Sequence, residues 1–296
     1  MRSRCALGLM VVLLGGTVEG QRKINRGFRV DSDVAVRIHN LVGSTTVTGW
    51  DHDSIQVVGS IPLNGGGFYG GGSGRFAKLG VDGQDLSAGG PGSTLEVRVP
   101  RGARIWIKSA TATVALGDLS GEVEVNSVTG GIDLTGTPRV ANLETIDGDV
   151  TVTGLATVVR VRTGAGAVRV EGVRGDLTVT TIQGPVTVKT DELLAGRIET
   201  VSGTVEVTAG VPPNGQLDVE THDGPVTLVL PPDVDARFEL STVKGSIVTK
   251  LADGVERPRD RTTRFSTGKK AGAGRGGAIA IRTFSGRVRV EVAKAR

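Results

Sequence analysis

Three aspartates form the one cluster of acidic side chains that can be built around a repeated turn of this sequence. Asp147 and Asp149 flank Gly148, and Asp133 follows the equivalent glycine one repeat earlier. Two carboxylates roughly 5–9.5 Å apart could hydrolyse a glycosidic bond, and Asp-Gly-Asp resembles a fragment of a calcium loop. The other ligands of such a loop are missing, and aspartate is common where chains reverse. We therefore interpret these aspartates as turn residues and assign no catalytic, metal or cofactor site.

The three histidines give no stronger signal for an active site. His52 stands between two aspartates, His222 precedes Asp223, and His39 is isolated. A zinc site usually needs three or four ligands at defined spacing, which neither pair supplies. A Ser-His-Asp triad is compatible with any sequence order, but no nucleophile-elbow motif accompanies these residues. The sequence therefore predicts a protein that is not an enzyme.

The elements that position these side chains are marked by a Ser or Thr followed three residues later by Gly. Successive glycines are 18, 18, 18, 19, 21, 21 and then 41 residues apart, a period typical of repeat architectures. We expect each glycine to turn a corner through a positive φ or a close backbone approach, and each hydroxyl to bond nearby backbone. The eight structural corner glycines are Gly130, Gly148, Gly166, Gly184, Gly203, Gly224, Gly245 and Gly286.

Apolar residues alternate with polar ones on both sides of every corner. The position five residues before the glycine is always apolar, as is the position two residues after it. Alternation of this kind predicts strands with one buried face. Aromatic residues make up only 3% of the chain, so the core must be built from stacked Val, Ile and Leu side chains. The predicted fold is all-β, a right-handed parallel β-helix, or β-solenoid, with about 18–21 residues per coil.

The remaining segments divide the chain into distinct parts. In residues 1–20, Arg2 and Arg4 precede a short apolar run that ends in small residues, which predicts a signal peptide cleaved near Gly20. Cys5 would leave with it, so no disulfide would stabilise the mature chain. We expect N-terminal capping strands over residues 21–61, a Gly-rich loop or insertion over 62–93, the solenoid over 94–251, a Gly-rich basic loop over 252–276, and a final coil over 277–296. A weaker repeat with Ala112 in place of glycine opens the solenoid.

Charge and hydropathy limit the partners of this chain. The formal net charge is +4, acids and bases are interspersed, and the pattern lacks the basic stripe and stacking aromatics that nucleic-acid binding uses. No later apolar run is long enough for a transmembrane anchor. We therefore expect an exported protein in the periplasm, at the cell surface or outside the cell, with no nucleic-acid partner.

The repeats TVSG and TIDGDV, the leading VTGWDHDSI and the segment LEVRVPRGARIWIKS resemble the bacterial putative-adhesin family of domains of unknown function. The resemblance covers about residues 30–292 outside the two glycine-rich segments. It implies a single-stranded right-handed β-helix that is exported and exposed at the surface, and it supplies no catalytic or ligand residues. The sequence departs from the usual repeat at Gly166, at Ala112 and in the long glycine-rich insertion.

These observations favour a non-enzymatic, secreted solenoid that binds or scaffolds at the cell envelope, with a polysaccharide or another cell-surface component as the partner class. One alternative is a carbohydrate-active enzyme, a polysaccharide lyase or hydrolase, since β-helices often host such activities. That alternative would place its site at Asp133, Asp147 and Asp149. The other alternative is a passive rod that assembles end to end.

Overall fold

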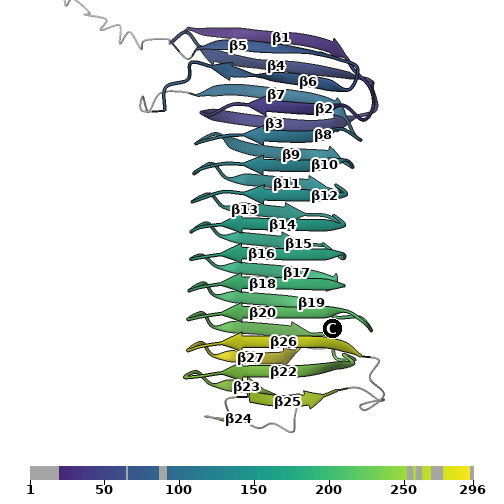
Figure 1. The fold of residues 1–296 in the computed structure, drawn as a ribbon, viewed down its shortest axis with the longest axis vertical. Coiled ribbons are helices and arrows are strands. Elements are labelled where there is room, and N and C mark those ends of the chain that lie inside the picture. Colours follow the sequence, from purple (N-terminus) through teal and green to yellow (C-terminus); the bar gives the residue numbers. More distant parts are fainter. Residues whose placement is uncertain are drawn as a thin grey trace, which may run out of the picture.

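The chain folds into a rod of two facing β-sheets (Figure 1). The structure is a computed structural model and describes residues 20–64, 66–86, 92–251, 256–257, 262–267 and 276–293. Sheet A contains 14 of the described strands and sheet B contains 13. The export signal predicted for residues 1–20, including Cys5, lies outside the described residues except for Gly20.

The strands of each sheet follow one another along the rod in an order that differs from their order in the sequence. Sheet A consists of β1 (Gln21–Arg29), β4 (Ser54–Pro62), β7 (Ser93–Pro100), β3 (Gly43–Trp50), β9 (Thr113–Leu119), β11 (Ile132–Gly136), β13 (Val150–Thr153), β15 (Val168–Glu171), β17 (Val186–Glu192), β19 (Val205–Gly210), β21 (Val226–Leu230), β27 (Val288–Val292), β23 (Ile247–Thr249) and β24 (Glu256–Arg257). Sheet B consists of β5 (Gly67–Ser73), β6 (Phe76–Asp82), β2 (Ala35–His39), β8 (Arg104–Lys108), β10 (Glu122–Asn126), β12 (Val140–Glu144), β14 (Val158–Thr163), β16 (Asp176–Thr181), β18 (Ala195–Thr200), β20 (Gln216–Thr221), β26 (Gly277–Thr283), β22 (Ala236–Thr242) and β25 (Thr262–Ser266).

Each coil runs along one strand of sheet B, turns a corner and returns along one strand of sheet A. Neighbouring coils pair in parallel and place equivalent repeat positions side by side, as Val125 beside Leu143 and Ile132 beside Val150. The alternating apolar positions point between the sheets and are buried in every repeat. The predicted β-solenoid is therefore confirmed.

The corner glycines lie where two coils approach most closely. A Cβ on Gly148 would stand 2.3 Å from the carbonyl oxygen of Gly130, and a Cβ on Gly166 would stand 1.8 Å from that of Gly148. Of the eight corner glycines, Gly184 alone has a positive φ, at 128°. Close approach is therefore the main reason for glycine at these corners. The buried hydroxyl of Thr145 accepts a hydrogen bond from the Gly148 N–H at 3.0 Å, and the seven other repeats place a Ser or Thr at the same position, five of them with the same bond.

The last coil of the sequence is not the last coil of the rod. Strand β26 lies between β20 and β22, and β27 lies between β21 and β23 (Figure 1). The chain thus passes from β21 to the outer coil formed by β22 and β23 and then returns to fill the gap. The corner column shows the same order, because Gly286 contacts the Gly224 carbonyl and Gly245 contacts the Gly286 carbonyl.

The N-terminal end has the same interleaving and departs from the sequence expectation. Strands β2 and β3, within the segment expected only to cap the rod, form a full coil between β6–β7 and β8–β9. The prediction of a loop over residues 62–93 is wrong for residues 67–82, where β5 and β6 form an antiparallel hairpin at the edge of sheet B. Alternating residues such as Ala77 and Leu79 bury one face of β6, which outweighs the glycine content of the segment.

Antiparallel strands close both ends of the rod. At the N-terminal end β1 pairs with β4, and β4 pairs with β7. At the other end β25 pairs with β22, and β24 pairs with β23, where a basic loop was expected over residues 252–276. The rest of that segment, including Lys269, Lys270 and Arg275, lies outside the described residues. Phe238 and Phe265 stack with ring centroids 4.6 Å apart and cover the terminal coil.

Candidate functional site

The three aspartates of the predicted acid cluster are exposed, but only Asp147 and Asp149 lie in a turn, so the interpretation of Asp133 as a turn residue is wrong. Asp133 lies on β11 beside Thr151 of β13, whereas Asp147 and Asp149 lie in the corner before β13. The carboxylate of Asp149 accepts a hydrogen bond from the Ala167 N–H at 2.8 Å, which links two coils. The described residues contain no group of three or more His, Cys, Asp or Glu side chains arranged to hold a metal ion.

The histidines are packed against aromatic rings. His52 makes an edge contact with Trp50 at a centroid distance of 4.9 Å, and His222 stacks on Phe284 at 4.9 Å. Asp51, beside His52, is ion-paired with Arg101 at 2.8 Å. Within the described ranges, the only hydroxyl hydrogen-bonded to an imidazole belongs to Tyr69, which contacts His39 Nδ1 at 3.0 Å.

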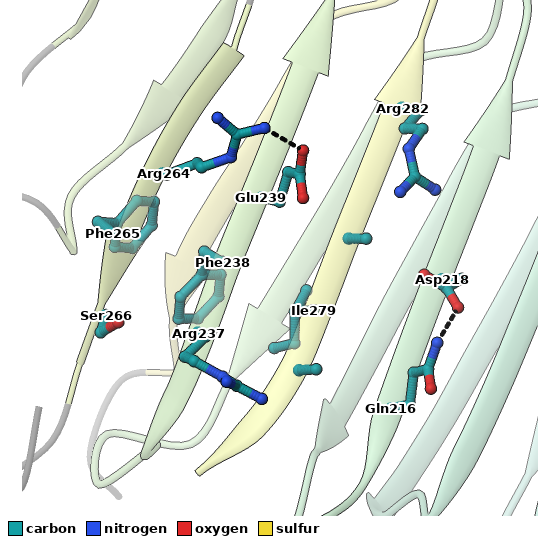
Figure 2. Close-up of a pocket in the computed structure, with 12 residues that line it drawn as sticks. Gln216, Asp218, Arg237, Phe238, Glu239, Arg264, Phe265, Ser266, Ile279 and Arg282 are labelled. Atoms are coloured by element: carbon teal, nitrogen blue, oxygen red, sulfur yellow. Dashed lines mark hydrogen bonds and ion pairs between the residues drawn. The ribbon is translucent and has the colours of Figure 1, made fainter. Parts of the chain in front are cut away.

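A hollow of about 570 Å³ lies on the outer face of sheet B near its C-terminal end (Figure 2). The small side chains of Ala278 and Ala280 on the inserted strand β26 form its floor. The register places Asp218 of β20 and Glu239 of β22 on either side of Ala280. The hollow therefore exists because the inserted strand carries small outward residues between two strands that carry large ones.

Both carboxylates of this C-terminal hollow have partners within it. Arg264 on β25 donates to Glu239 at 2.8 Å and holds the pKa of that carboxyl below its ordinary value. Gln216 donates to Asp218 at 2.6 Å. Figure 2 shows both contacts, together with Arg237 and Arg282. The hollow thus mixes both signs of charge and offers no single-sign field to a ligand.

The opposite end of the same face collects positive charge. Three adjacent strands, β6, β2 and β8, are in parallel register and present nine outward positions in three rows. The rows are Phe76, Ala35 and Arg104; Lys78, Arg37 and Trp106; and Gly80, His39 and Lys108. We name the four cations Arg37, Lys78, Arg104 and Lys108 the basic patch.

Tyr69 on β5 anchors the edge of the basic patch through His39. Its hydroxyl reaches across Gly80, where a Cβ would lie 2.9 Å from that hydroxyl. Burial, together with the charges of Lys78, Lys108 and Arg37, lowers the pKa of His39, while burial and Asp82 raise the pKa of Tyr69. Both groups therefore stay neutral near pH 7, and the positive charge of the patch comes from the four Lys and Arg side chains.

Sequence reasoning missed the basic patch because its members come from three distant segments. Alternation alone places Arg37, Lys78, Arg104 and Lys108 on the polar face of their strands. That signal was present, but it does not tell which strands are neighbours. The patch depends on β2 lying between β6 and β8, a stacking order that a repeat pattern does not specify.

An apolar column runs along the corner edge of the rod. The residue after each corner Ser or Thr points outward and is large and apolar in six repeats: Val128, Ile146, Ile182, Val201, Val243 and Phe284. Ile146 and Ile182 are 63% and 57% exposed. A hollow of about 590 Å³ lies beside the C-terminal part of this column. Sequence reasoning missed this column because it followed the strand positions before and after each corner and not the residue directly after the Ser or Thr.

The two sheets, the parallel coils and the glycine corners define a two-sheet β-solenoid with an extended flat face. The chain belongs to the Toastrack DUF4097 family, whose model matches residues 74–291. This match confirms the resemblance to the putative-adhesin domains of unknown function. No curated protein matches the chain significantly.

Several solved structures are similar to the chain over most of its length. A putative adhesin from Bacteroides fragilis is 10% identical with a TM-score of 0.42, and the alignment covers 93% of this chain and 99% of that one. A putative adhesin from Parabacteroides merdae is 12% identical with a TM-score of 0.32, covering 94% and 98%. A putative cell adhesion protein from Clostridium sporogenes is 9% identical with a TM-score of 0.26, covering 93% and 100%. Separately, no helix in the described part of this chain is long and apolar enough to cross a membrane.

Proposed function

We propose that this protein is an exported, non-enzymatic β-solenoid that acts as an adhesin or as a binding and scaffolding protein of the cell envelope. The observation that carries the proposal is the outer face of sheet B, where parallel strands hold outward side chains in register along the rod. Solenoids use such extended surfaces to bind partners, because the repeated backbone hydrogen bonds hold many side chains in fixed positions. The neutral and charged side chains of this face suit an envelope polymer or surface component.

The binding proposal is tested with purified protein and envelope polysaccharide fractions. We expect the protein to retain a fraction without generating new reducing or unsaturated sugar ends in the same samples. Sustained turnover of a polysaccharide would contradict a non-enzymatic role. Retention of no envelope fraction at all would contradict the binding role.

Export is tested by determining the N-terminus of the protein from an exporting host. The expected mature chain begins near Gln21 and is found in the periplasm, at the surface or in the medium. A cytoplasmic chain that retains residues 1–20 would contradict the proposed export.

One observation favours the alternative of a carbohydrate-active enzyme. Asp218 and Glu239 lie on either side of Ala280 in the C-terminal hollow, on strands about 10 Å apart. This distance is close to the upper limit for the two carboxylates of an inverting hydrolase. Because Arg264 lowers the pKa of Glu239, that residue would serve as the general base. Activity that survives in both Asp218→Asn and Glu239→Gln would refute this alternative.

A further inference from the structure

The three rows of outward positions on β6, β2 and β8 include four cations and no acid, and the exposed Asp82 follows them at the end of β6. None of the four has an ion pair or side-chain hydrogen bond with another described residue. Strong hydrogen bonds to anions are therefore still available to the basic patch. A surface of one charge sign attracts oppositely charged ligands and raises their association rate.

The acids at the rim of the patch already have partners. Asp33 is ion-paired with Arg75, and Glu122 with Arg139. Asp82 accepts from the Gly67 N–H at 3.0 Å, and Glu124 accepts from Trp106 Nε1 at 2.9 Å. The positive charge of the four central cations is thus not neutralised by a direct contact with any of these acids.

Aromatic rings hold two of the cations in place. The Arg37 guanidinium lies 5.7 Å from the ring centroid of Phe76 and 5.5 Å from that of Trp106. Lys78 Nζ lies 5.4 Å from the ring centroid of Tyr69. Cation–π contacts restrain these side chains without using their N–H groups. A guanidinium held this way keeps its fork of donors available for the two oxygens of a carboxylate or sulfate.

The surface beside the patch is hollowed. A hollow of about 330 Å³ is lined by the short side chains of Ala35 and Val140 and is flanked by Arg37, Arg104 and Trp106. Glu122 and Glu124 also line it, and they are held by Arg139 and Trp106 respectively. This volume lies at the small end of the roughly 300–1,000 Å³ found for ligand sites. A polymer residue can therefore sink between two cations instead of resting on a flat surface.

We propose that the basic patch binds an acidic polysaccharide through the carboxylate or sulfate groups of successive sugar residues. The proposal rests on the proposed binding function and names the class of ligand. Neighbouring strands are about 4.8 Å apart, so the four cations are spread over more than one sugar and suit a polymer. A cation lies over each of Phe76, Trp106 and Tyr69, which favours contact with anionic groups over stacking of bases or insertion into lipid.

The test uses a pair of ligands that differ only in charge. Binding of the full-length exported protein to dextran sulfate and to neutral dextran of matched length is measured by biolayer interferometry, with alginate as the carboxylate polymer. We expect dextran sulfate and alginate to bind, dextran to bind at least about tenfold more weakly, and affinity to fall as salt is raised.

Two variants with equal loss of charge locate the site. The patch variant combines Arg37→Gln, Lys78→Gln, Arg104→Gln and Lys108→Gln. The control variant neutralises four exposed arginines elsewhere on the same sheet face, with Arg160→Gln, Arg162→Gln, Arg237→Gln and Arg282→Gln. We expect the patch variant to lose about tenfold or more in affinity and the control about twofold or less, because distant exposed charges are screened. The single variants Arg37→Gln and Lys108→Gln separate binding from folding. We expect each to bind more weakly while its thermal unfolding midpoint stays unchanged.

Several outcomes would overturn the inference. Equal binding of dextran and dextran sulfate would exclude recognition of charge, and equal losses in the two quadruple variants would exclude the patch. Tighter binding to single-stranded oligonucleotides or to vesicles of anionic lipid would assign the patch to another ligand. If the protein retains envelope fractions but binds none of the acidic polymers, the inference fails and the proposed binding function stands. Cleavage of the polymers would instead overturn the proposed function.

Discussion

At the residue scale, the corner glycines are required by the contact between coils. Gly148 is a corner glycine, whereas Gly131 directly follows the corner glycine of the preceding coil. The two differ in how closely the backbone of a neighbouring coil approaches them. A Cβ on Gly148 would be 2.3 Å from a carbonyl oxygen, whereas a Cβ on Gly131 would be 3.5 Å from its nearest neighbour, an ordinary contact. We expect Gly148→Ala to lower the free energy of unfolding by about 1–3 kcal/mol through overpacking. Gly131→Ala should change it by about 0.5 kcal/mol or less. Equal effects of the two substitutions in denaturant unfolding would contradict this account.

His39 links the basic patch to the pH dependence of stability. Desolvation first, then Lys78, Lys108 and Arg37, hold its pKa below the ordinary value of 6.5, while Tyr69 and Trp106 pack on its ring. The unfolded chain therefore binds a proton at higher pH than the folded chain does. The resulting stabilisation is present above pH 6.5 and is lost as pH falls toward the lowered pKa of the folded state.

The variant His39→Gln isolates this contribution. We expect the midpoint of thermal unfolding of the wild type to fall more steeply between about pH 7.5 and pH 5 than that of His39→Gln, because the variant lacks the titrating imidazole. The comparison between the two proteins removes the contribution of the carboxylates. Parallel pH profiles would show that His39 does not couple protonation to folding.

At the scale of elements, the inserted coil of β26 and β27 holds the terminal coil on the rod. Strands β22 and β23 reach the other coils only through β26 and β27. Ile281 on β26 is fully buried, so Ile281→Ala should cost about 2–5 kcal/mol. Hydrogen exchange measured by mass spectrometry should show reduced protection over both 277–292 and 236–249, because a repeat contacts only its neighbours.

Leu240→Ala is the matched control for this prediction, since Leu240 on β22 pairs with Ile281 on β26 and is also fully buried. Its effect should be confined to 236–249, because β26 and β27 remain paired with β20 and β21. Identical protection patterns in the two variants would mean that the terminal coil does not depend on the inserted one.

At the scale of the whole molecule, the N-terminal edge of the rod is protected by charge. β1 is the edge strand of sheet A at the N-terminal end of the rod and carries the exposed cations Arg22, Lys23, Arg26 and Arg29. Charged side chains on an edge strand oppose pairing with a second chain. We expect the wild-type protein to keep the mass of a monomer in sedimentation velocity as its concentration rises. This result would contradict the alternative of a passive rod that assembles end to end.

Replacing those four β1 cations with threonine should make the mass rise with concentration. The quadruple variant at Arg160, Arg162, Arg237 and Arg282 loses the same charge away from the edge and should stay monomeric. Association of the control, or a monomeric β1 variant, would contradict edge protection by charge.

Much of the coil could be predicted from local sequence. The Ser/Thr-to-Gly spacing located all eight corners, and alternation identified the buried positions, because corner sterics and strand burial act within one coil. The motif does not identify one further corner, at Gly43. This glycine has φ at 115° and follows the buried Asn40 instead of a Ser or Thr. The asparagine does not repeat the threonine bond to the glycine N–H; its side-chain amide instead donates to Thr45 Oγ1 at 3.1 Å and to the Ser44 carbonyl at 3.0 Å. Of the three aspartates interpreted as turn residues, Asp147 and Asp149 lie in a corner and Asp133 lies on β11.

By itself, the sequence determined the fold class, the coil period, the core positions and the glycine corners. Only the tertiary structure decided the stacking order at both ends, and with it the C-terminal hollow and the basic patch. The physical reason is that every coil presents nearly the same hydrogen-bonding edge and the same apolar face, so a local pattern lets almost any coil pair with any other. Which coil lies beside which is decided by the connections and the capping strands, and those neighbours bring Arg37, Lys78 and Arg104 together.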